Sequence, residues 1–178
     1  MKVQIGVIGS EKKNMSQEEM KYLRMAEEVG ENIAKIGCTL IVGGCSGISE
    51  AACKGAIKFG GLTVGTPGKE RGSSVGDVGV EICTPIDIGD YLFAGIPSSD
   101  AIIVFPGDAG TIAEIAIAYR YKKPLILLKD YEKLVGNLFK NINKEYPLFI
   151  ANDAKEAVEI AYKTGKESLI KRIEAKLT

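Results

Sequence analysis

The sequence predicts a doubly wound α/β fold, with a mostly parallel sheet and helices on both faces. Short β-branched runs alternate with segments of helical period along the whole chain. Two of these runs, 101–105 and 124–128, are almost entirely apolar, as in strands buried on both faces of a parallel sheet. Glycines directly follow three of the strands, at the edge where sheets of this kind bind ligands.

The first third of the chain alternates strand and helix. A strand at 3–8 precedes the capping-box pattern Ser16-x-x-Glu19, which opens a helix whose apolar positions repeat at a helical period until Gly37. We then expect a strand at 38–42, a helix at about 48–59 and a strand at 62–65.

The remainder begins with a loop at 66–78 that is rich in Gly and Ser and contains Lys69 and Arg71. A loop of this length is typical of a functional segment. We then expect a weak strand at 80–84, a short helix at 86–97, strands at 101–105, 124–128 and 147–150, and helices at 111–121, at 131–141 and from 154 towards the end. Since no linker interrupts the pattern, we predict one Rossmann-like domain over residues 1–178.

The composition excludes several kinds of catalytic and binding site. The chain has 178 residues, 23 Lys+Arg, 23 Asp+Glu and no histidine, which excludes a Ser-His-Asp triad and a His-ligated metal site. Its four cysteines have no metal-like spacing, so we expect no metal site. The balanced charge argues against nucleic-acid binding. Because no stretch approaches the ~20 apolar residues of a membrane span and no export signal is visible, we expect a cytoplasmic protein.

Glycine is over-represented, with 21 residues, and all but two of them precede Thr111. Three strand-ending loops are glycine-rich, at 9–10, 43–47 and 107–111, and right-handed crossovers place all three on one edge of the sheet. Free backbone N–H groups near helix N-termini bind phosphate. We therefore predict a nucleotide-sized anion site. Its phosphate-binding residues would be Gly9, Ser10, Gly43, Gly44, Gly47, Gly107, Asp108, Ala109, Gly110 and Thr111.

Two of these loops resemble a known family. Residues 106–114, PGDAGTIAE, resemble the PGGxGTxxE signature of the Lonely Guy phosphoribohydrolases, once described as lysine decarboxylases. Residues 43–51 resemble the GGxxGxMxA loop of the same superfamily, and the agreement extends from residue 1 to about 130. The short branch that includes molybdenum-cofactor carrier proteins is the most similar. The resemblance implies a Rossmann-like dimer that binds a nucleoside monophosphate or, in the carriers, a phosphorylated pterin.

The resemblance also implies roles for acidic residues. Lonely Guy enzymes hydrolyse the N-glycosidic bond of nucleoside 5′-monophosphates, and Glu114 would stabilise the oxocarbenium-like sugar. The helix dipole would favour its ionised form in a first helical turn. Thr111-x-x-Glu114 is also a capping-box pattern, which leaves a purely structural role open. Glu50 is a candidate for contacting a ribose hydroxyl, or it faces solvent.

The chain departs from the family at two places. Tyr91 and Leu92 occupy positions where the enzymes have an Arg-Lys pair with a catalytic arginine, and Asp108 replaces the second glycine of PGG. We expect Arg71 to take the place of the missing catalytic arginine by closing over the phosphate from its loop. These departures favour binding over catalysis.

Three functions therefore stay open. The first is binding of a phosphorylated small molecule resembling a nucleoside monophosphate. The alternatives are phosphoribohydrolase activity, with Glu114 and Arg71 as catalytic residues, and non-catalytic carriage of the molybdenum cofactor, a molybdopterin. Apolar side chains on most sides of the helix at 114–121 indicate a homodimer or a higher homo-oligomer.

Overall fold

The computed structural model describes residues 1–11, 16–17, 19–43, 46–68, 70–74, 78–84, 94–131, 135 and 146–176. The predicted helix at 131–141 and most of the one at 86–97 lie outside the described residues. The same holds for Gly44, Lys69, Tyr91 and Leu92. Within the described part, no helix is both long enough and apolar enough to cross a membrane.

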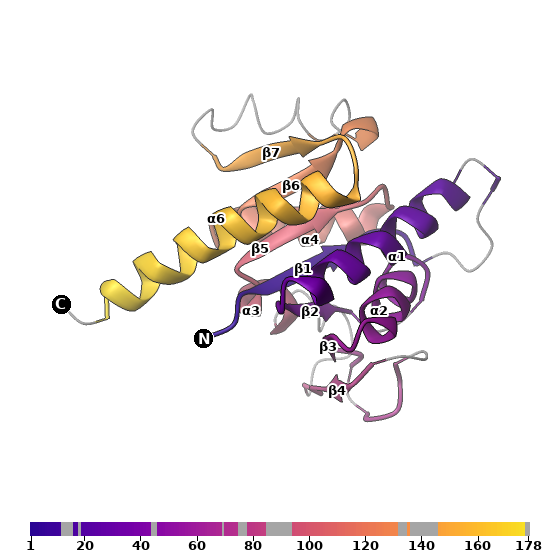
Figure 1. Ribbon diagram of the computed structural model, residues 1–178, viewed down its shortest axis with the longest axis horizontal. Helices are drawn as coiled ribbons and strands as arrows, with labels where there is room; N and C mark the ends of the chain where they lie inside the picture. The colour runs from indigo at the N-terminus through magenta and orange to yellow at the C-terminus, as the bar shows by residue number, and fades with distance from the viewer. Residues whose placement is uncertain are drawn as a thin grey trace.

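A seven-stranded sheet forms the centre of the molecule (Figure 1). Its strands are β1 (Gln4–Ile8), β2 (Thr39–Val42), β3 (Leu62–Gly65), β4 (Val80–Glu81), β5 (Ala101–Val104), β6 (Leu125–Leu128) and β7 (Leu148–Ala151). The order is β4-β3-β2-β1-β5-β6-β7, and every neighbouring pair is parallel. This confirms the predicted doubly wound sheet. The chain proceeds outward from β1 on one side and from β5 on the other, so the two strands flank a topological switch point.

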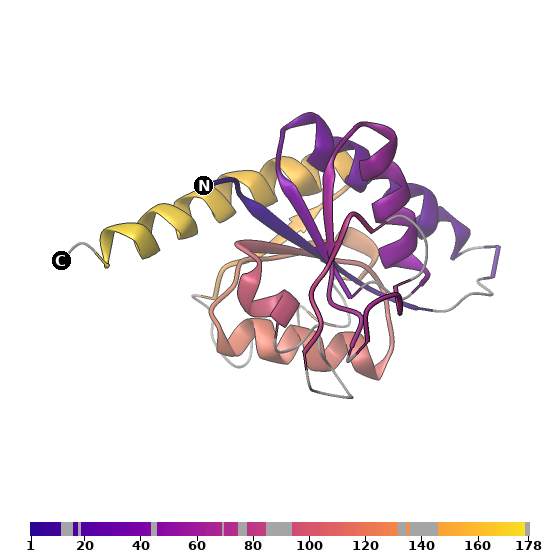
Figure 2. The same cartoon turned by 90° about the horizontal axis from the view of Figure 1, so that it is seen from below.

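Helices cover both faces of the sheet (Figure 2). One face carries α1 (Met20–Lys35), α2 (Ile48–Lys58) and α6 (Ala154–Glu174), and the other carries α3 (Ile96–Ser98) and α4 (Ala109–Arg120). The predicted capping box precedes α1, because the Ser16 N–H donates to Glu19 Oε2 (2.8 Å) and the Glu19 N–H donates to Ser16 Oγ (3.3 Å). Strand β4 is shorter than predicted, and α6 continues to Glu174.

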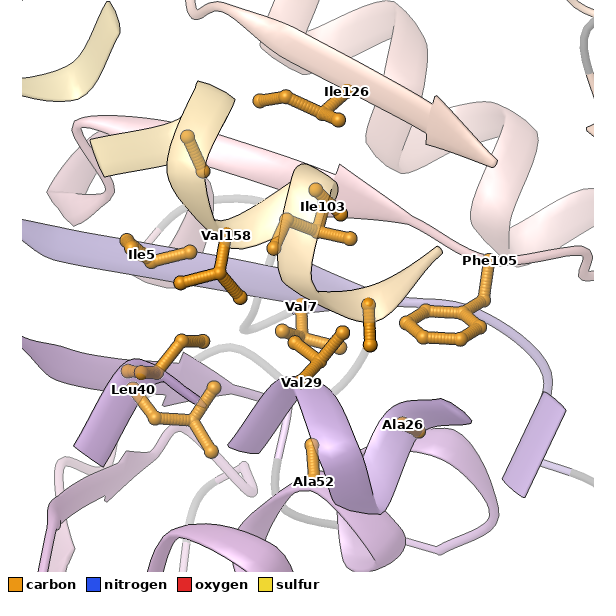
Figure 3. Packing of buried hydrophobic residues seen from close by; sticks show 14 of the residues in the cluster. Ile5, Val7, Ala26, Val29, Leu40, Ala52, Ile103, Phe105, Ile126 and Val158 are labelled. Atoms are coloured by element: carbon orange, nitrogen blue, oxygen red, sulfur yellow. The ribbon is translucent and has the colours of Figure 1, made fainter. Parts of the chain in front are cut away.

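Alternating side chains of the central strands build two cores. Ile5, Val7 and Ile103 belong to the core beneath α1, α2 and α6 (Figure 3), whereas Ile102 and Val104 belong to the core beneath α4. Because both faces of β5 and β6 are buried, these strands are apolar throughout, as the sequence indicated. Each fully buried aliphatic side chain contributes about 2 kcal/mol of transfer free energy.

Helices α1 and α2 approach each other through glycines within the helices. A Cβ atom on Gly30 would lie 1.9 Å from the Ala52 carbonyl oxygen, and one on Gly55 would lie 1.9 Å from the Glu27 carbonyl oxygen. Part of the glycine excess is therefore explained by helix packing rather than by loops. The close contact fixes α1 against α2, and these two helices begin near the strand-ending loops.

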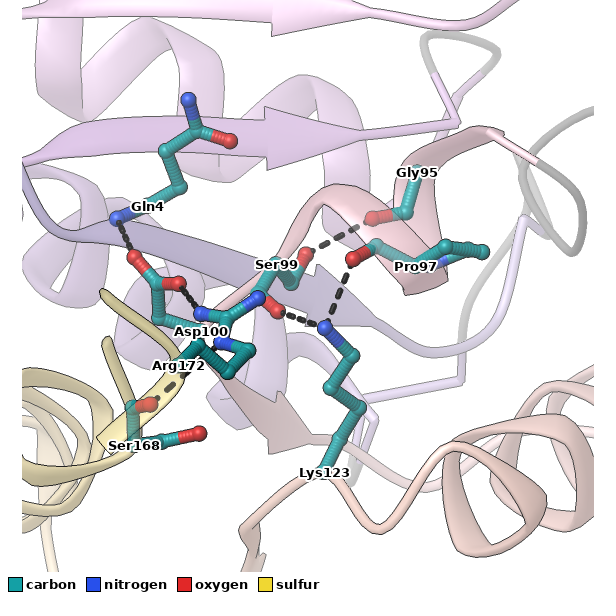
Figure 4. A network of polar contacts seen from close by, with 8 residues as sticks. All are labelled: Gln4, Gly95, Pro97, Ser99, Asp100, Lys123, Ser168 and Arg172. Atoms are coloured by element: carbon teal, nitrogen blue, oxygen red, sulfur yellow. Dashed lines mark hydrogen bonds and ion pairs between the residues drawn. The ribbon is translucent and has the colours of Figure 1, made fainter. Parts of the chain in front are cut away.

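A polar network holds the amino ends of the central strands (Figure 4). Asp100, just before β5, accepts a hydrogen bond from the Gln4 N–H (2.8 Å) and pairs with Arg172 of α6. Lys123 donates to the carbonyl oxygens of Pro97 and Ser99, both at 2.6 Å, and its burial lowers its pKa to about 8. Buried side chains therefore close this edge, and the glycine-rich loops lie at the opposite one.

The α1–α2 contact yields a stability prediction. Helix propensity alone would make Gly30→Ala stabilising by about 1 kcal/mol. We expect the opposite, a loss of about 2 kcal/mol in the free energy of unfolding, because the new methyl group collides with the Ala52 carbonyl. Guanidinium unfolding measures the difference, and Glu28→Ala, at an exposed position of the same helix, serves as the control. A Gly30→Ala protein more stable than the wild type would contradict this packing.

Candidate functional site

The loops that follow β1, β2 and β5 are joined by hydrogen bonds. The Ser10 N–H donates to the Pro106 carbonyl oxygen (3.1 Å), and the Ile48 N–H donates to the Ser10 carbonyl oxygen (3.0 Å). Ser46 Oγ donates to the Glu11 carbonyl oxygen (2.6 Å). The structure thus brings the three predicted loops together at the switch point of the sheet.

Glycine is required at two positions of this junction. Gly47 has a φ of +59°, and a Cβ there would lie 2.3 Å from the Ser10 carbonyl oxygen. A Cβ on Gly107 would lie 2.0 Å from Thr111 Oγ1. Both glycines therefore serve the contact between loops and helices, whether or not a ligand is bound.

Helix α4 begins two residues earlier than predicted, at Ala109, with Asp108 as its N-cap. Asp108 Oδ1 accepts a hydrogen bond from the Gly110 N–H (3.0 Å), so its carboxylate lies at the positive end of the helix dipole. Thr111 is within the first turn and Glu114 is in the second, which rules out the predicted Thr111–Glu114 capping box. Within the described residues, no group accepts from the N–H groups of Ala109 and Thr111.

A cleft with a volume of about 110 Å³ opens beside this junction. Ser10, Pro106, Gly107 and Asp108 form its loop side, and Glu19, Tyr22 and Ile48 form its helix side. This volume is below the usual range of roughly 300–1,000 Å³ for small-molecule sites. Two lining residues are carboxylates, and none of the described lining residues is a lysine or an arginine.

The helix wall of the cleft was not predicted as part of the site. Tyr22 and Glu19 belong to the beginning of α1, where the sequence pattern indicates helix capping and core packing. Their place beside the loops depends on how α1 crosses the sheet, so no local signal in the sequence could identify them.

Glu114 lies half-buried on α4 and does not line the cleft. Burial, together with smaller contributions from the charges of Glu11 and Asp108, raises the pKa of its carboxyl group to about 8. The expected ionised carboxylate is therefore wrong, because the residue lies beyond the first turn and among other acidic groups. A pKa raised to about 8 favours the protonated form of Glu114, which can donate a hydrogen bond.

Arg71 and Glu50 lie elsewhere along the same edge. Arg71 is exposed and lies in a loop that is hydrogen-bonded to β4. In this loop, the Gly72 N–H donates to Glu81 Oε2 (2.6 Å) and the Ser74 N–H donates to Glu81 Oε1 (3.0 Å). These hydrogen bonds, with a smaller contribution from Arg71, lower the pKa of Glu81. Glu50 is exposed in the first turn of α2. Neither Arg71 nor Glu50 lines the cleft.

Comparisons with known proteins agree with this architecture. The sequence model of the SLOG cluster4 family matches residues 2–167. An uncharacterised protein of Archaeoglobus fulgidus is 39% identical over 127 residues, which are 71% of this chain and 80% of that protein.

Two similar solved structures carry functional descriptions. The molybdenum cofactor binding protein of Rippkaea orientalis is 30% identical, with a TM-score of 0.76 over 100% of this chain and 99% of that one. The molybdenum cofactor carrier protein of Chlamydomonas reinhardtii is also 30% identical, with a TM-score of 0.78 over 92% of this chain and 98% of that one.

The raised pKa of Glu114 predicts a pH-dependent stability. Between the carboxyl pKa values of the unfolded chain and the folded protein, about 4.5 and about 8, only the folded protein holds the proton, so stability falls as pH rises. From about pH 6 to about pH 8.5, we expect wild type to lose about 1–2 kcal/mol more than Glu114→Gln. Urea unfolding at each pH measures the free energy of unfolding of both proteins. Other titrating groups, such as Lys123, are common to both proteins and therefore cancel in the comparison. Parallel pH profiles would contradict the raised pKa.

Proposed function

This chain belongs to the SLOG cluster4 family, and we propose that it binds a phosphorylated small molecule, such as a nucleoside monophosphate, where β1, β2 and β5 end. The observation that carries the proposal is the junction of three glycine-rich loops beside a cleft at the switch point of the sheet. Ligands of open parallel α/β sheets bind at such points, beyond the carboxyl ends of the strands.

The beginning of α4 is the proposed phosphate site. Its N–H groups at Ala109 and Thr111 have no acceptor among the described residues, and the helix dipole favours an anion there. The Ser10 N–H is not one of these donors, because it donates to the Pro106 carbonyl oxygen. Asp108 already caps the helix, so the phosphate must share this end with a carboxylate. We therefore expect weaker phosphate binding than in a loop with glycine at position 108.

The similar solved structures favour one form of this function, in which the protein carries a bound cofactor without catalysing a reaction. Both neighbours at 30% identity are described as proteins that bind or carry the molybdenum cofactor. In this chain, the raised pKa of Glu114 favours its protonated form, whereas stabilising an oxocarbenium-like sugar requires a negative charge. Binding of the cofactor at the same edge would need no catalytic carboxylate.

Hydrolysis of the N-glycosidic bond is the second candidate. A strongly raised pKa beside a ligand site is typical of catalytic groups, and a protonated Glu114 suits proton donation to the leaving base. Arg71 would have to reach the phosphate from the loop after β3, two strands and about 10 Å from β1. The loop would then leave its hydrogen bonds to Glu81.

The proposed assembly is a homodimer or a higher homo-oligomer. Helix α4 leaves apolar side chains at the surface on the side away from the sheet, including Ile112 (38% exposed) and the alanines at 113 and 116. Tyr121, just after the helix, is 52% exposed. A second copy packed on this face would bury it next to Glu114, which links assembly to the ligand edge.

The phosphate site is tested by Thr111→Val, which removes one hydroxyl group at nearly constant volume. We expect about tenfold weaker binding of AMP or GMP in calorimetry, since a hydrogen bond to a charged group is worth about 1.5 kcal/mol or more. Thr164→Val in α6 removes a hydroxyl far along the chain and is the control. Equal affinities in wild type and Thr111→Val would contradict a contribution of the Thr111 hydroxyl group to the phosphate site.

The same samples distinguish carriage from hydrolysis. Incubation with AMP, GMP, CMP and UMP, followed by chromatography, detects any free base. Release that disappears in Glu114→Ala would establish the hydrolase. Binding without release would establish a carrier or binding protein, and the absence of any binding by nucleotides or pterins would reject the proposed function.

A further inference from the structure

Two backbone N–H groups of the loop after β3 converge on one carboxylate. The Gly72 N–H donates to Glu81 Oε2 (2.6 Å) and the Ser74 N–H donates to Glu81 Oε1 (3.0 Å), so a separate donor holds each oxygen. Neighbouring backbone N–H groups that point at one anion form the concave sites known as nests. The loop therefore contains an anion site that is occupied by a side chain of the protein itself.

The backbone of this loop has the shape of a nest without help from Glu81. Gly72 has a φ of +88°, although a Cβ there would meet no heavy atom within 4 Å beyond its chain neighbours. Glycine is thus favoured here by the direction of the backbone and not by lack of space. Ser73 Oγ donates to the Glu70 carbonyl oxygen (2.7 Å) and closes the turn. The two N–H groups should therefore stay aligned when the carboxylate leaves.

Glu81 reaches the nest from a separate segment, β4, at one end of the sheet. On either side of it, the Gly79 N–H donates to Thr63 Oγ1 (2.7 Å) and the Ile82 N–H donates to the Gly65 carbonyl oxygen (2.9 Å). These bonds hold the backbone of β4 against β3 independently of the carboxylate. Because the contact between Glu81 and the Gly72 N–H is exposed, an anion from solution can compete for it.

We propose that the nest at Gly72 and Ser74 is a second oxyanion site, which takes a phosphate group, and that Glu81 blocks this site in the free protein. A phosphate group can accept both N–H groups as the carboxylate does, and it has further oxygens for the guanidinium of Arg71. Arg71 is close enough to act on an anion here, since its charge contributes to the lowered pKa of Glu81. None of these residues lines the cleft at the switch point, so the site does not depend on the proposed function.

Amide chemical shifts of the ¹⁵N-labelled protein during a titration with inorganic phosphate test the proposal. At the amides of Gly72 and Ser74, we expect Glu81→Gln to bind phosphate about tenfold more tightly than the wild type, because the competing carboxylate is removed. Glu70→Gln removes the same charge from an exposed position of the same turn and should keep the wild-type affinity. Adding Arg71→Gln to Glu81→Gln should weaken phosphate binding again.

Two results would overturn the proposal. Phosphate that binds Glu81→Gln no more tightly than Glu70→Gln would exclude blocking by Glu81. Phosphate-dependent shifts in Glu81→Gln that leave Gly72 and Ser74 unchanged would exclude the site.

A parallel titration with AMP identifies the source of the phosphate group. If the amides of Gly72 and Ser74 move at the same AMP concentration as those of residues 107–111, the nest takes the phosphate of the ligand bound there. A response to inorganic phosphate alone identifies free phosphate. The nest can respond to phosphate even if no nucleotide binds, so failure of the proposed function and failure of this site give different results.

Discussion

The close contact between the loops after β1, β2 and β5 is the constraint on which the rest of the molecule depends. Both backbone groups of Ser10 are used in it, the N–H towards Pro106 and the carbonyl oxygen towards Ile48. This contact is feasible because Gly47 has no Cβ to strike the Ser10 carbonyl. It fixes the starts of α2 and α4 relative to each other at the switch point, while the Asp100–Arg172 pair fixes the opposite edge.

The contact also sets the chemistry that the edge can perform. Because the loops use several of their N–H groups for one another, an incoming phosphate depends on the remaining donors of α4. Asp108 occupies one of these donors, and it raises the pKa of Glu114 together with burial and Glu11. Binding is accordingly better supported than hydrolysis.

The sequence predicted most of the architecture because the buried strands of a parallel sheet have an unmistakable composition. The superfamily was predicted as well, from residues 43–51 and 106–114, and the family match and solved neighbours confirm it. What the sequence could not predict depends on contacts between distant segments. Asp108 rather than Thr111 caps α4, burial and the charges of Glu11 and Asp108 raise the pKa of Glu114, and Tyr22 reaches the cleft from α1. The loop that contains Arg71 is joined to Glu81 of β4 through the N–H groups of Gly72 and Ser74, and Arg71 does not line the cleft, which the spacing of charges did not indicate.

Amide chemical shifts of the ¹⁵N-labelled protein, recorded during a titration with GMP, test the location of the site most directly. The account predicts that the largest changes occur at Ser10 and at residues 107–111, with smaller ones at the beginning of α1. The amides of Gln4, Asp100 and Lys123, at the opposite edge of the sheet, should stay nearly constant. Larger changes at that opposite edge than at the glycine-rich loops would contradict the account.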